Sequence, residues 1–599
     1  MQMNSPKKYY QSQIEKLDFA KKRLLKQKSL YSILRLLIAV LAIIALWELW
    51  GFSVVMALLA FWILVAVFVF VVTKDLKNKE TLENNRSLKN ICKEEIRIHD
   101  FDFQHLPGGA EFCPAHHAYA QDLDLFGKAS LYQYLNRTRS EQGHKNFANR
   151  ILNPSSKETI AQMHEACNVL TQNPGWSLQF QAHGISHPIT LASESKINEW
   201  RIEDDPLKKN PWLRLIRIAF PAMTTVSLFL FLFEIIPGSL FTFFLITYFA
   251  VSSYISKIFQ PQYAKLNRIV PELETMEQCI RMIESNTFDS SLFRQLKEKI
   301  SIHNETASRS IGQLKKILAR LDYRYNPVVY IPLNSFFLWD LQQFFALGKW
   351  KTKYSDQIPL WFEAIAETES LISVGSAAFN HPGWCYPEFS SEKYVFIAGD
   401  MGHPLIPLSK RVNNSFSTRG IKQVNLITGS NMAGKSTFLR SVGVNAILAM
   451  MGAPVCCNKL TISEMKIMSS MRISDNLEEN TSTFYAELKK LKEIIEAIRN
   501  QETVFILLDE ILRGTNSADR HTGSIALLKQ LIRENVSCIV ATHDLELAAL
   551  AGAYPGDFHN YHFDVQVQNE ELFFDYKIKE GICQSMNASL LMKKIGIEL

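Results

Sequence analysis

The sequence has little that could form a disulfide scaffold. Its nine cysteines are spread over 599 residues, and no two of them have C-x-x-C spacing. This scatter is typical of reduced thiols in a cytosolic body and argues against a small secreted fold held by cross-links. Metal ligands are also scarce: "CPAHHAY" (113–119) offers Cys113, His116 and His117, but nothing nearby completes a four-ligand set. We therefore expect no metal centre there.

Excess positive charge is absent outside the N-terminus. The net charge is +6, and residues 1–30 hold eight Lys or Arg against two acids, so the rest of the chain is balanced. That balance gives no sign of a basic surface large enough for duplex nucleic acid. We expect the basic arm, 1–30, to contact anionic lipid headgroups because it precedes an apolar run. A solvated basic helix is the alternative.

Long apolar runs, by contrast, are present. They span 31–50, 52–72, 215–236 and 239–259. Each run is long enough to cross a bilayer as a helix, and each pair is joined by a very short connection. We expect two transmembrane helical hairpins, 31–73 and 213–259, with buried core helices as the alternative.

The charges at the ends of these runs predict their orientation. Lys and Arg flank the outer ends of both hairpins, whereas the tips carry only Glu48 or Glu234. Cytoplasmic flanks of membrane helices are enriched in Lys and Arg. We therefore expect a multi-pass protein of the inner (cell) membrane with four transmembrane helices. Its N-terminus and its large segments would be cytoplasmic.

The remaining segments differ in texture. Polar stretches with apolar residues at helical spacing give way, from about residue 396, to short β-rich runs that alternate with helices, which indicates an α/β sheet with crossover helices. The expected strands are 422–427, 503–508, 536–541, 561–567 and 571–578. The expected domains are the basic arm 1–30, hairpin 31–73, linker 74–120, helical core 121–212, hairpin 213–259, helical lever 260–395 and α/β domain 396–599.

One loop of the α/β domain has the pattern of a phosphate-binding site. Residues 429–436 fit G-x-x-x-x-G-K-[ST], with a strand before and a helix after. Such a loop turns its N–H groups inward, and the helix N-terminus adds a positive dipole. Lys435 is expected to bridge the β- and γ-phosphates of ATP, and Ser436 to bind Mg²⁺. The expected nucleotide contacts are Gly429, Ser430, Asn431, Met432, Ala433, Gly434, Lys435, Ser436 and Thr437. A fortuitous Gly-rich turn is the alternative.

Two further strand ends carry candidate catalytic groups. "VFILLDE" places Asp509 and Glu510 at the end of an apolar strand, and "CIVATHD" ends the next strand with His543. Asp509 is placed to hold Mg²⁺, and Glu510 to take a proton from a water in line with the γ-phosphate. His543 falls where a γ-phosphate sensor would lie, although a lone His at a strand end often has a structural role. The candidate catalytic residues are Glu510, His543 and Lys435.

Several motifs together resemble one family. "TGSNMAGKSTFLRSVGV", "TSTFYAEL", "LLDEILRGTNSADR", "ATHDLELA" and "GHPLIPLSKRVNNSFS" are similar to segments of the ATPase domain of MutS-type proteins. The resemblance implies an ABC-type P-loop ATPase that works as a dimer with ATP and Mg²⁺. It also implies that Ser482 and Thr483 reach the γ-phosphate bound by the other subunit. An ordinary Ser/Thr cap on the helix from Phe484 is compatible with that role.

The sequence also departs from that family. Ser430 replaces a usual proline, Leu512 replaces a usual glycine, and Arg411 stands where an aromatic often stacks on adenine, a role Tyr576 could take. Residues 1–120 lack the F-x-E motif with which mismatch-reading members probe a lesion.

Two functions are compatible with these features. The first is a membrane-anchored MutS-type ATPase that acts as a homodimer, with DNA as a candidate ligand and without mismatch recognition. The second is a structural or signalling membrane ATPase that gates assembly of an unknown protein partner without nucleic acid. A transporter is disfavoured because the apolar runs lack the polar residues of a substrate path.

Overall fold

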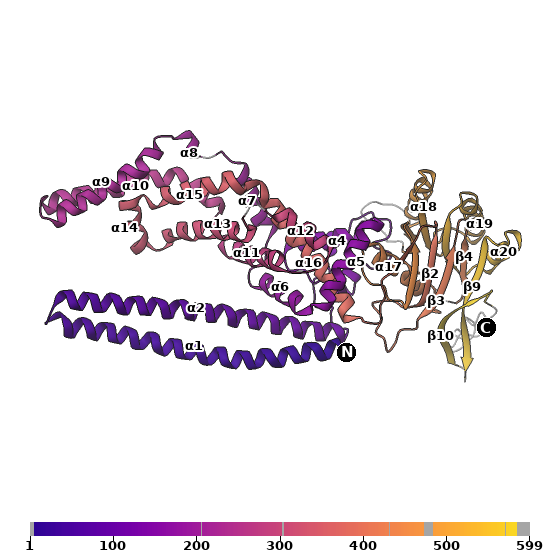
Figure 1. The fold of residues 1–599 in the computed structure, drawn as a ribbon. Helices are drawn as coiled ribbons and strands as arrows, with labels where there is room; N and C mark the ends of the chain where they lie inside the picture. Colours follow the sequence, from indigo (N-terminus) through magenta and orange to yellow (C-terminus); the bar gives the residue numbers. More distant parts are fainter. Residues whose placement is uncertain are drawn as a thin grey trace.

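The computed structural model describes residues 5–204, 206–266, 268–301, 305–430, 432–472, 483–568 and 571–583. Figure 1 shows an elongated molecule, with two helical hairpins pointing toward one end and an α/β domain at the other. A helical region lies between them and connects the two ends. The tips of both hairpins are therefore far from the α/β domain.

The first hairpin consists of two very long helices, α1 (Pro6–Trp50) and α2 (Val54–His99). Neither has Pro or Gly after its first residue, so nothing in the sequence interrupts either helix. The apolar runs at 31–50 and 52–72 form only the half near the tip. The arm 1–30, as far as it is described, continues α1, and the expected linker 74–120 is helical as far as His99.

The base of this hairpin is fixed to the helical region by a buried polar network. Tyr10 donates from its hydroxyl to Asn380 Oδ1 (2.9 Å), and Asn380 Nδ2 donates to Glu95 Oε2 (2.8 Å). Arg137 forms an ion pair with Glu95 (2.5 Å), and both side chains are almost fully buried. Lys7 pairs with Asp100 at this base. The start of the basic arm thus lies at the end of the hairpin opposite the tip.

The second hairpin comprises α9 (Leu213–Leu232) and α10 (Gly238–Leu266). Both hairpins have their tips at the same end of the molecule (Figure 1). Within the residues that the structure describes, four helices, α1, α2, α9 and α10, are long and apolar enough to cross a membrane. A short apolar helix, α14 (Pro327–Phe337), packs against α9 and α10.

The helical region is built around α16 (Ile358–Asn380), which packs on α4, α5 and α11 and is buried over most of its length. Its other helices are α3 (Leu131–Leu135), α4 (Glu141–Leu152), α5 (Lys157–Gln172), α6 (Pro174–Ser186), α7 (Leu191–Ile202), α8 (Pro206–Lys209), α11 (Val270–Ser285), α12 (Ser291–Ile300), α13 (Ala307–Leu321) and α15 (Trp339–Tyr354). Short 3₁₀ turns are η1 (Ala110–Phe112), η2 (Asp322–Tyr325) and η3 (Ser355–Gln357).

The α/β domain contains two sheets. The larger has the order β10-β9-β4-β8-β7-β6, and its strands from β9 to β6 run parallel. Its strands are β4 (Val424–Thr428), β6 (Lys466–Ser470), β7 (Val504–Asp509), β8 (Ser537–Thr542), β9 (Phe558–Gln568) and β10 (Glu571–Glu580). All five expected strands are confirmed within a few residues, and β6 is an additional one.

The smaller sheet has the order β1-β5-β2-β3 and was not expected. Its strands are β1 (Glu388–Ser390), β2 (Val395–Met401), β3 (Asn414–Arg419) and β5 (Lys459–Ser463). The helical elements of the domain are α17 (Lys435–Met450), α18 (Thr483–Arg499), α19 (Ser517–Arg533), η4 (Leu545–Ala549) and α20 (Leu550–Ala553).

Candidate functional site

The candidate phosphate site begins where the buried strand β4 ends. The loop 429–434 follows it, and α17 then begins at Lys435. Gly429 (φ +147°) and Gly434 (φ +106°) have backbone conformations that residues with a side chain rarely adopt. A Cβ added to Gly429 would also lie 2.9 Å from the carbonyl oxygen of Phe563. The shape of the loop therefore depends on both glycines of the motif.

The Lys435 side chain lies inside this loop. It is only 5 % exposed, and its Nζ donates to the carbonyl oxygens of Gly429 (2.9 Å) and Ser430 (3.1 Å). His543 Nε2 lies 3.2 Å from the same nitrogen. Burial lowers the pKa of Lys435 to about 8, and nearby carboxylates partly oppose that shift. A phosphate group would give this ammonium a charged partner in place of neutral carbonyls.

Ser436 and Asp509 have the arrangement of a cation site. Ser436 donates from its hydroxyl to Asp509 Oδ2 (2.5 Å). Asp509 ends β7 and is 7 % exposed, and its Oδ1 is buried without a hydrogen-bond partner among the described residues. A buried carboxylate oxygen is costly when left unpaired. Since hydroxyl and carboxylate oxygens are ligands that Mg²⁺ prefers, the two side chains fit that ion.

The Glu510 carboxylate lies between two hydrogen-bond donors, His543 and Arg513. Its Oε1 lies 2.8 Å from His543 Nε2, and its Oε2 accepts from Arg513 Nε at 2.9 Å. The hydrogen bond with His543, aided by the charge of Arg513, lowers the pKa of Glu510 against the effect of burial. The carboxylate is thus ionised at neutral pH, as a proton acceptor must be.

Strand pairing explains why these groups meet. Asp509 of β7 is in register with Ala541 of β8, and Thr542 of β8 is in register with Thr428 of β4. Parallel strands end at one edge of a sheet, so side chains that follow β4, β7 and β8 gather there. The structure accordingly brings the three expected catalytic residues together, with His543 in contact with both Lys435 and Glu510.

The other expected nucleotide contacts fall into two groups. Ala433 is buried, whereas Met432 and Thr437 are exposed beside the loop. Asn431 and Ser482 lie outside the described residues, as does the side chain of Thr483, which begins α18. The expected role of Ser482 and Thr483 toward a second subunit stays a prediction.

Two contacts of the site were not foreseen. Arg513 binds the carboxylate of Glu510, and Glu487 of α18 accepts the backbone N–H groups of Leu512 and Arg513. Burial raises the pKa of Glu487, which is 4 % exposed. The spacing of Arg513, three residues after Glu510, was a readable signal. Nothing in the sequence singles out Glu487.

Residues considered for base recognition have different surroundings. The ring of Tyr576 borders the phosphate loop, because a Cβ added to Gly434 would lie 3.2 Å from its Cδ1. Tyr576 is 44 % exposed and so remains available for stacking. Arg411 instead donates to Asn413 Oδ1 (3.0 Å) and to Cys456 Sγ (2.9 Å). The Tyr576 ring also stacks on that of Phe574 (centroids 5.9 Å apart), and its stacking on adenine stays a prediction.

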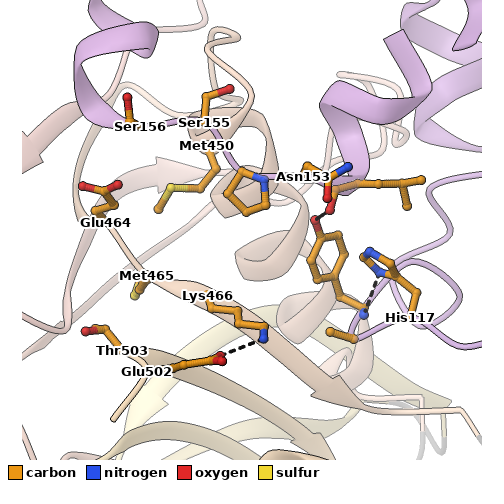
Figure 2. A pocket seen from close by; sticks show the side chains of 14 residues that line it. His117, Asn153, Ser155, Ser156, Met450, Glu464, Met465, Lys466, Glu502 and Thr503 are labelled. Carbon is orange, nitrogen blue, oxygen red and sulfur yellow. Dashed lines mark hydrogen bonds and ion pairs between the residues drawn. The ribbon is translucent and has the colours of Figure 1, made fainter. Parts of the chain in front are cut away.

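A cavity of about 700 Å³ lies elsewhere, between the helical region and the α/β domain (Figure 2). One wall carries the Lys466–Glu502 ion pair (2.7 Å). His117 lies on the opposite side, where its Nδ1 accepts backbone N–H groups in a structural role. Lys466 begins β6, so the cavity lies at the amino ends of the strands. The phosphate loop lies at their carboxyl ends, and the cavity is therefore not part of that site.

Comparison with known proteins shows that this domain is similar to one protein family. The family described as MutS domain V matches residues 425–594. The DNA mismatch repair protein MutS of Leptospira interrogans is 29 % identical over 255 residues, which cover 41 % of this chain and 29 % of the relative. MutS of Clostridium kluyveri is 33 % identical over 231 residues (37 % and 26 %). Human MutS protein homolog 4 is 32 % identical over 191 residues (31 % and 20 %).

These matches concern one part of the molecule. The chain spans less than a third of the length of each of these relatives. The α/β domain is similar to MutS domain V, and the matches support membership of the MutS family for the chain.

Proposed function

We propose that this protein is a membrane-anchored ATPase of the MutS type. The observation that carries the ATPase proposal is the Asp509 carboxylate, which is buried beside the phosphate loop, bonded to Ser436, and left with one unpaired oxygen. Ser436 and Asp509 would hold Mg²⁺, which neutralises phosphate charge when bound. Lys435 and the N–H groups of the loop would hold the phosphates of ATP.

The remaining site residues would act on the attacking water. Glu510 would orient that water and take its proton, while His543, placed between Glu510 and Lys435, would respond to the γ-phosphate. Because Arg513 binds the Glu510 carboxylate, it would have to release that carboxylate, or the carboxylate would have to bind Arg513 and the water at the same time. By family resemblance, a second copy of the chain would complete the site through Ser482 and Thr483.

The membrane proposal rests on an inverted burial pattern in the second hairpin. Ser227 of α9 and Ser252 of α10 are buried, whereas Phe229 and Phe243 are more than half exposed. In water the opposite arrangement is favourable, because apolar surface is then removed from solvent. In a bilayer the apolar side chains face lipid and the polar ones pair within the protein. The pattern therefore supports insertion of this hairpin.

DNA is a candidate ligand because relatives are DNA mismatch repair proteins. One observation favours the second function, assembly of a protein partner without nucleic acid. Three cations on α11–α13 are paired with acids: Arg281 with Glu277, Lys315 with Glu274 and Glu277, and Lys299 with Glu363. Paired cations have less charge available for DNA phosphates.

The ATPase proposal is tested by Lys435→Ala in detergent-solubilised full-length protein. We expect ATP turnover to fall by about 10²–10³, because a buried cation at the phosphates is lost. Lys410→Ala, at an exposed lysine of the same domain, is the control and should turn over ATP at the native rate. Native turnover in Lys435→Ala would contradict the proposal.

The choice between the two functions is tested by a gel-shift titration with duplex DNA at several salt concentrations. Binding through phosphate contacts weakens steeply as salt rises. No binding at low salt, with ATPase activity intact, would exclude DNA as the ligand and favour a protein partner.

A further inference from the structure

In helix α14 (Pro327–Phe337) polar side chains face the protein interior and apolar side chains face outward. Asn334 and Ser335 are buried at 4 % and 6 % exposure. Val328 is 83 % exposed, and Ile331 and Phe337 are each nearly half exposed. No residue of the helix carries a charge. A helix in contact with water on one side normally shows the opposite pattern.

Two polar side chains of α14, Tyr330 and Asn334, form hydrogen bonds inside the protein. Asp340, which is completely buried, accepts from the Arg324 guanidinium (2.9 and 2.7 Å), the Tyr330 hydroxyl (2.5 Å) and Ser256 Oγ (2.6 Å). Asn334 Nδ2 donates to the same Ser256 Oγ at 3.0 Å. Because Ser256 belongs to α10, this network fixes α14 to the second hairpin. It also fixes which side of α14 faces outward.

The position of α14 along the hairpin sets its depth. Thr224 of α9 donates to the Phe336 carbonyl oxygen at 2.6 Å, and Tyr248 of α10 packs on the Phe336 ring (centroids 6.3 Å apart). Thr224 lies about 17 Å of helix beyond the start of α9. If α9 crosses a bilayer, the C-terminal end of α14 lies within the hydrocarbon layer. With 11 residues, α14 is itself too short to cross.

Aromatic side chains flank α14 at both ends. Tyr323 and Tyr325, on the preceding turn η2, are 43 % and 60 % exposed. Trp339, which begins α15, stacks on Tyr323 with ring centroids 5.8 Å apart and nearly parallel planes. Tyr and Trp are enriched at the headgroup level of membranes, where one side of the ring is apolar and the other is wet.

We propose that α14 is a third membrane-contacting element, which enters the cytoplasmic leaflet without crossing it. The exposed side chains Val328, Ile331 and Phe337 would lie among acyl chains, and the flanking aromatic rings would lie near the headgroups. This inference rests on the proposed insertion of α9 and α10. The bilayer is the favoured occupant because the uncharged face of α14 continues the exposed apolar surface of those two helices.

The test uses full-length protein in vesicles of phosphatidylcholine and phosphatidylglycerol. Val328→Cys is labelled with an environment-sensitive fluorophore, and lipids with a nitroxide near the headgroup or deep in the chain act as quenchers. Leu59→Cys, on the apolar half of α2 at 59 % exposure, reports anchoring. Leu408→Cys, in the α/β domain at 76 % exposure, reports the aqueous phase. Labelling of the native cysteines is measured separately and subtracted.

We expect the Val328 label to lose fluorescence to the shallow nitroxide more than to the deep one, while the Leu408 label is unaffected. A Val328 label that behaves like the Leu408 label, with the Leu59 label quenched, would overturn the inference and leave the anchoring proposal standing. An unquenched Leu59 label would overturn both. If adding unlabelled protein relieved the quenching of the Val328 label, a second copy of the chain would be the occupant of the outward face of α14. That result would overturn the inference. Ile331→Cys repeats the measurement if Val328→Cys does not fold.

Discussion

The α/β domain and the second hairpin differ in the kind of side chain that they bury. In β4, β7 and β8 every residue is buried. In α9 and α10 the buried positions include Thr224, Ser227 and Ser252, while Phe229, Phe243 and Phe249 are exposed. Both arrangements satisfy hydrogen bonds internally, but only the first also removes apolar surface from solvent. The contrast supports the proposal that one chain is folded for two solvents, and each prediction below tests one side of it.

The largest effect is expected at the nucleotide site. Glu510→Gln removes the proton acceptor and keeps the shape of the side chain, so turnover should fall by about 10²–10⁴. Nucleotide affinity, measured with a fluorescent ATP analogue, should stay near the native value because no phosphate ligand is lost. Hydrolysis at the native rate would show that Glu510 is not the base.

Two equivalent truncations compare the cores directly. Phe505 in β7 is fully buried, and Phe505→Ala should lower the free energy of unfolding by about 3–5 kcal/mol. Phe243 in α10 is 63 % exposed, and Phe243→Ala should change it little. Thermal unfolding of each full-length variant in the same detergent measures both. Equal losses would mean that Phe243 packs against protein in the native assembly.

A charge on the outward face of the second hairpin tests whether lipid or water surrounds that face. Val226 in α9 is 56 % exposed, and Val226→Asp should oppose insertion by about 3 kcal/mol if that face meets lipid. Leu408→Asp, at a site that is 76 % exposed in the α/β domain, is the matched control and should have no effect. The fraction of each variant that alkaline carbonate extracts from membranes is the readout. Equal extraction would indicate that water surrounds α9.

The smallest effect is a pH dependence at the phosphate loop. The pKa of Lys435 is lowered to about 8 in the nucleotide-free protein, so its ammonium loses its proton as pH rises through that value. Only the charged form attracts phosphate, so the dissociation constant of ATP should rise above pH 8, by at most about tenfold per pH unit. Adenosine has no phosphate and should bind independently of pH in this range. A flat ATP curve would show that Lys435 stays charged.

The sequence predicted the centre of the α/β domain well because its signals are local. The runs at 503–508 and 536–541 are continuous and apolar, and the spacing of Gly429, Gly434 and Lys435 identifies the loop. The smaller sheet was missed because β1 has only three residues and because β3 (NSFSTR) has a single large apolar residue, Phe416, to mark its alternation. The helical continuation past residue 73 was missed because charged residues there resemble a linker.

Contacts between distant segments were beyond sequence reasoning. The ion pair of Arg137 with Glu95 joins residues from separate elements, and no spacing rule connects them. The proposed role of α14 was hidden for a related reason: eleven residues are too few for a membrane signal by length, and its orientation follows only from the burial of Asn334 and Ser335.

The unbroken length of α2 would set the distance between the membrane and the helical region. With the first hairpin inserted as proposed, the part of α2 from residue 73 to His99 extends about 40 Å beyond the hydrocarbon layer. The buried Glu95 network anchors the far end of this rod to the helical region. The α/β domain would therefore lie at a fixed distance from the membrane, with the helical region between them (Figure 1).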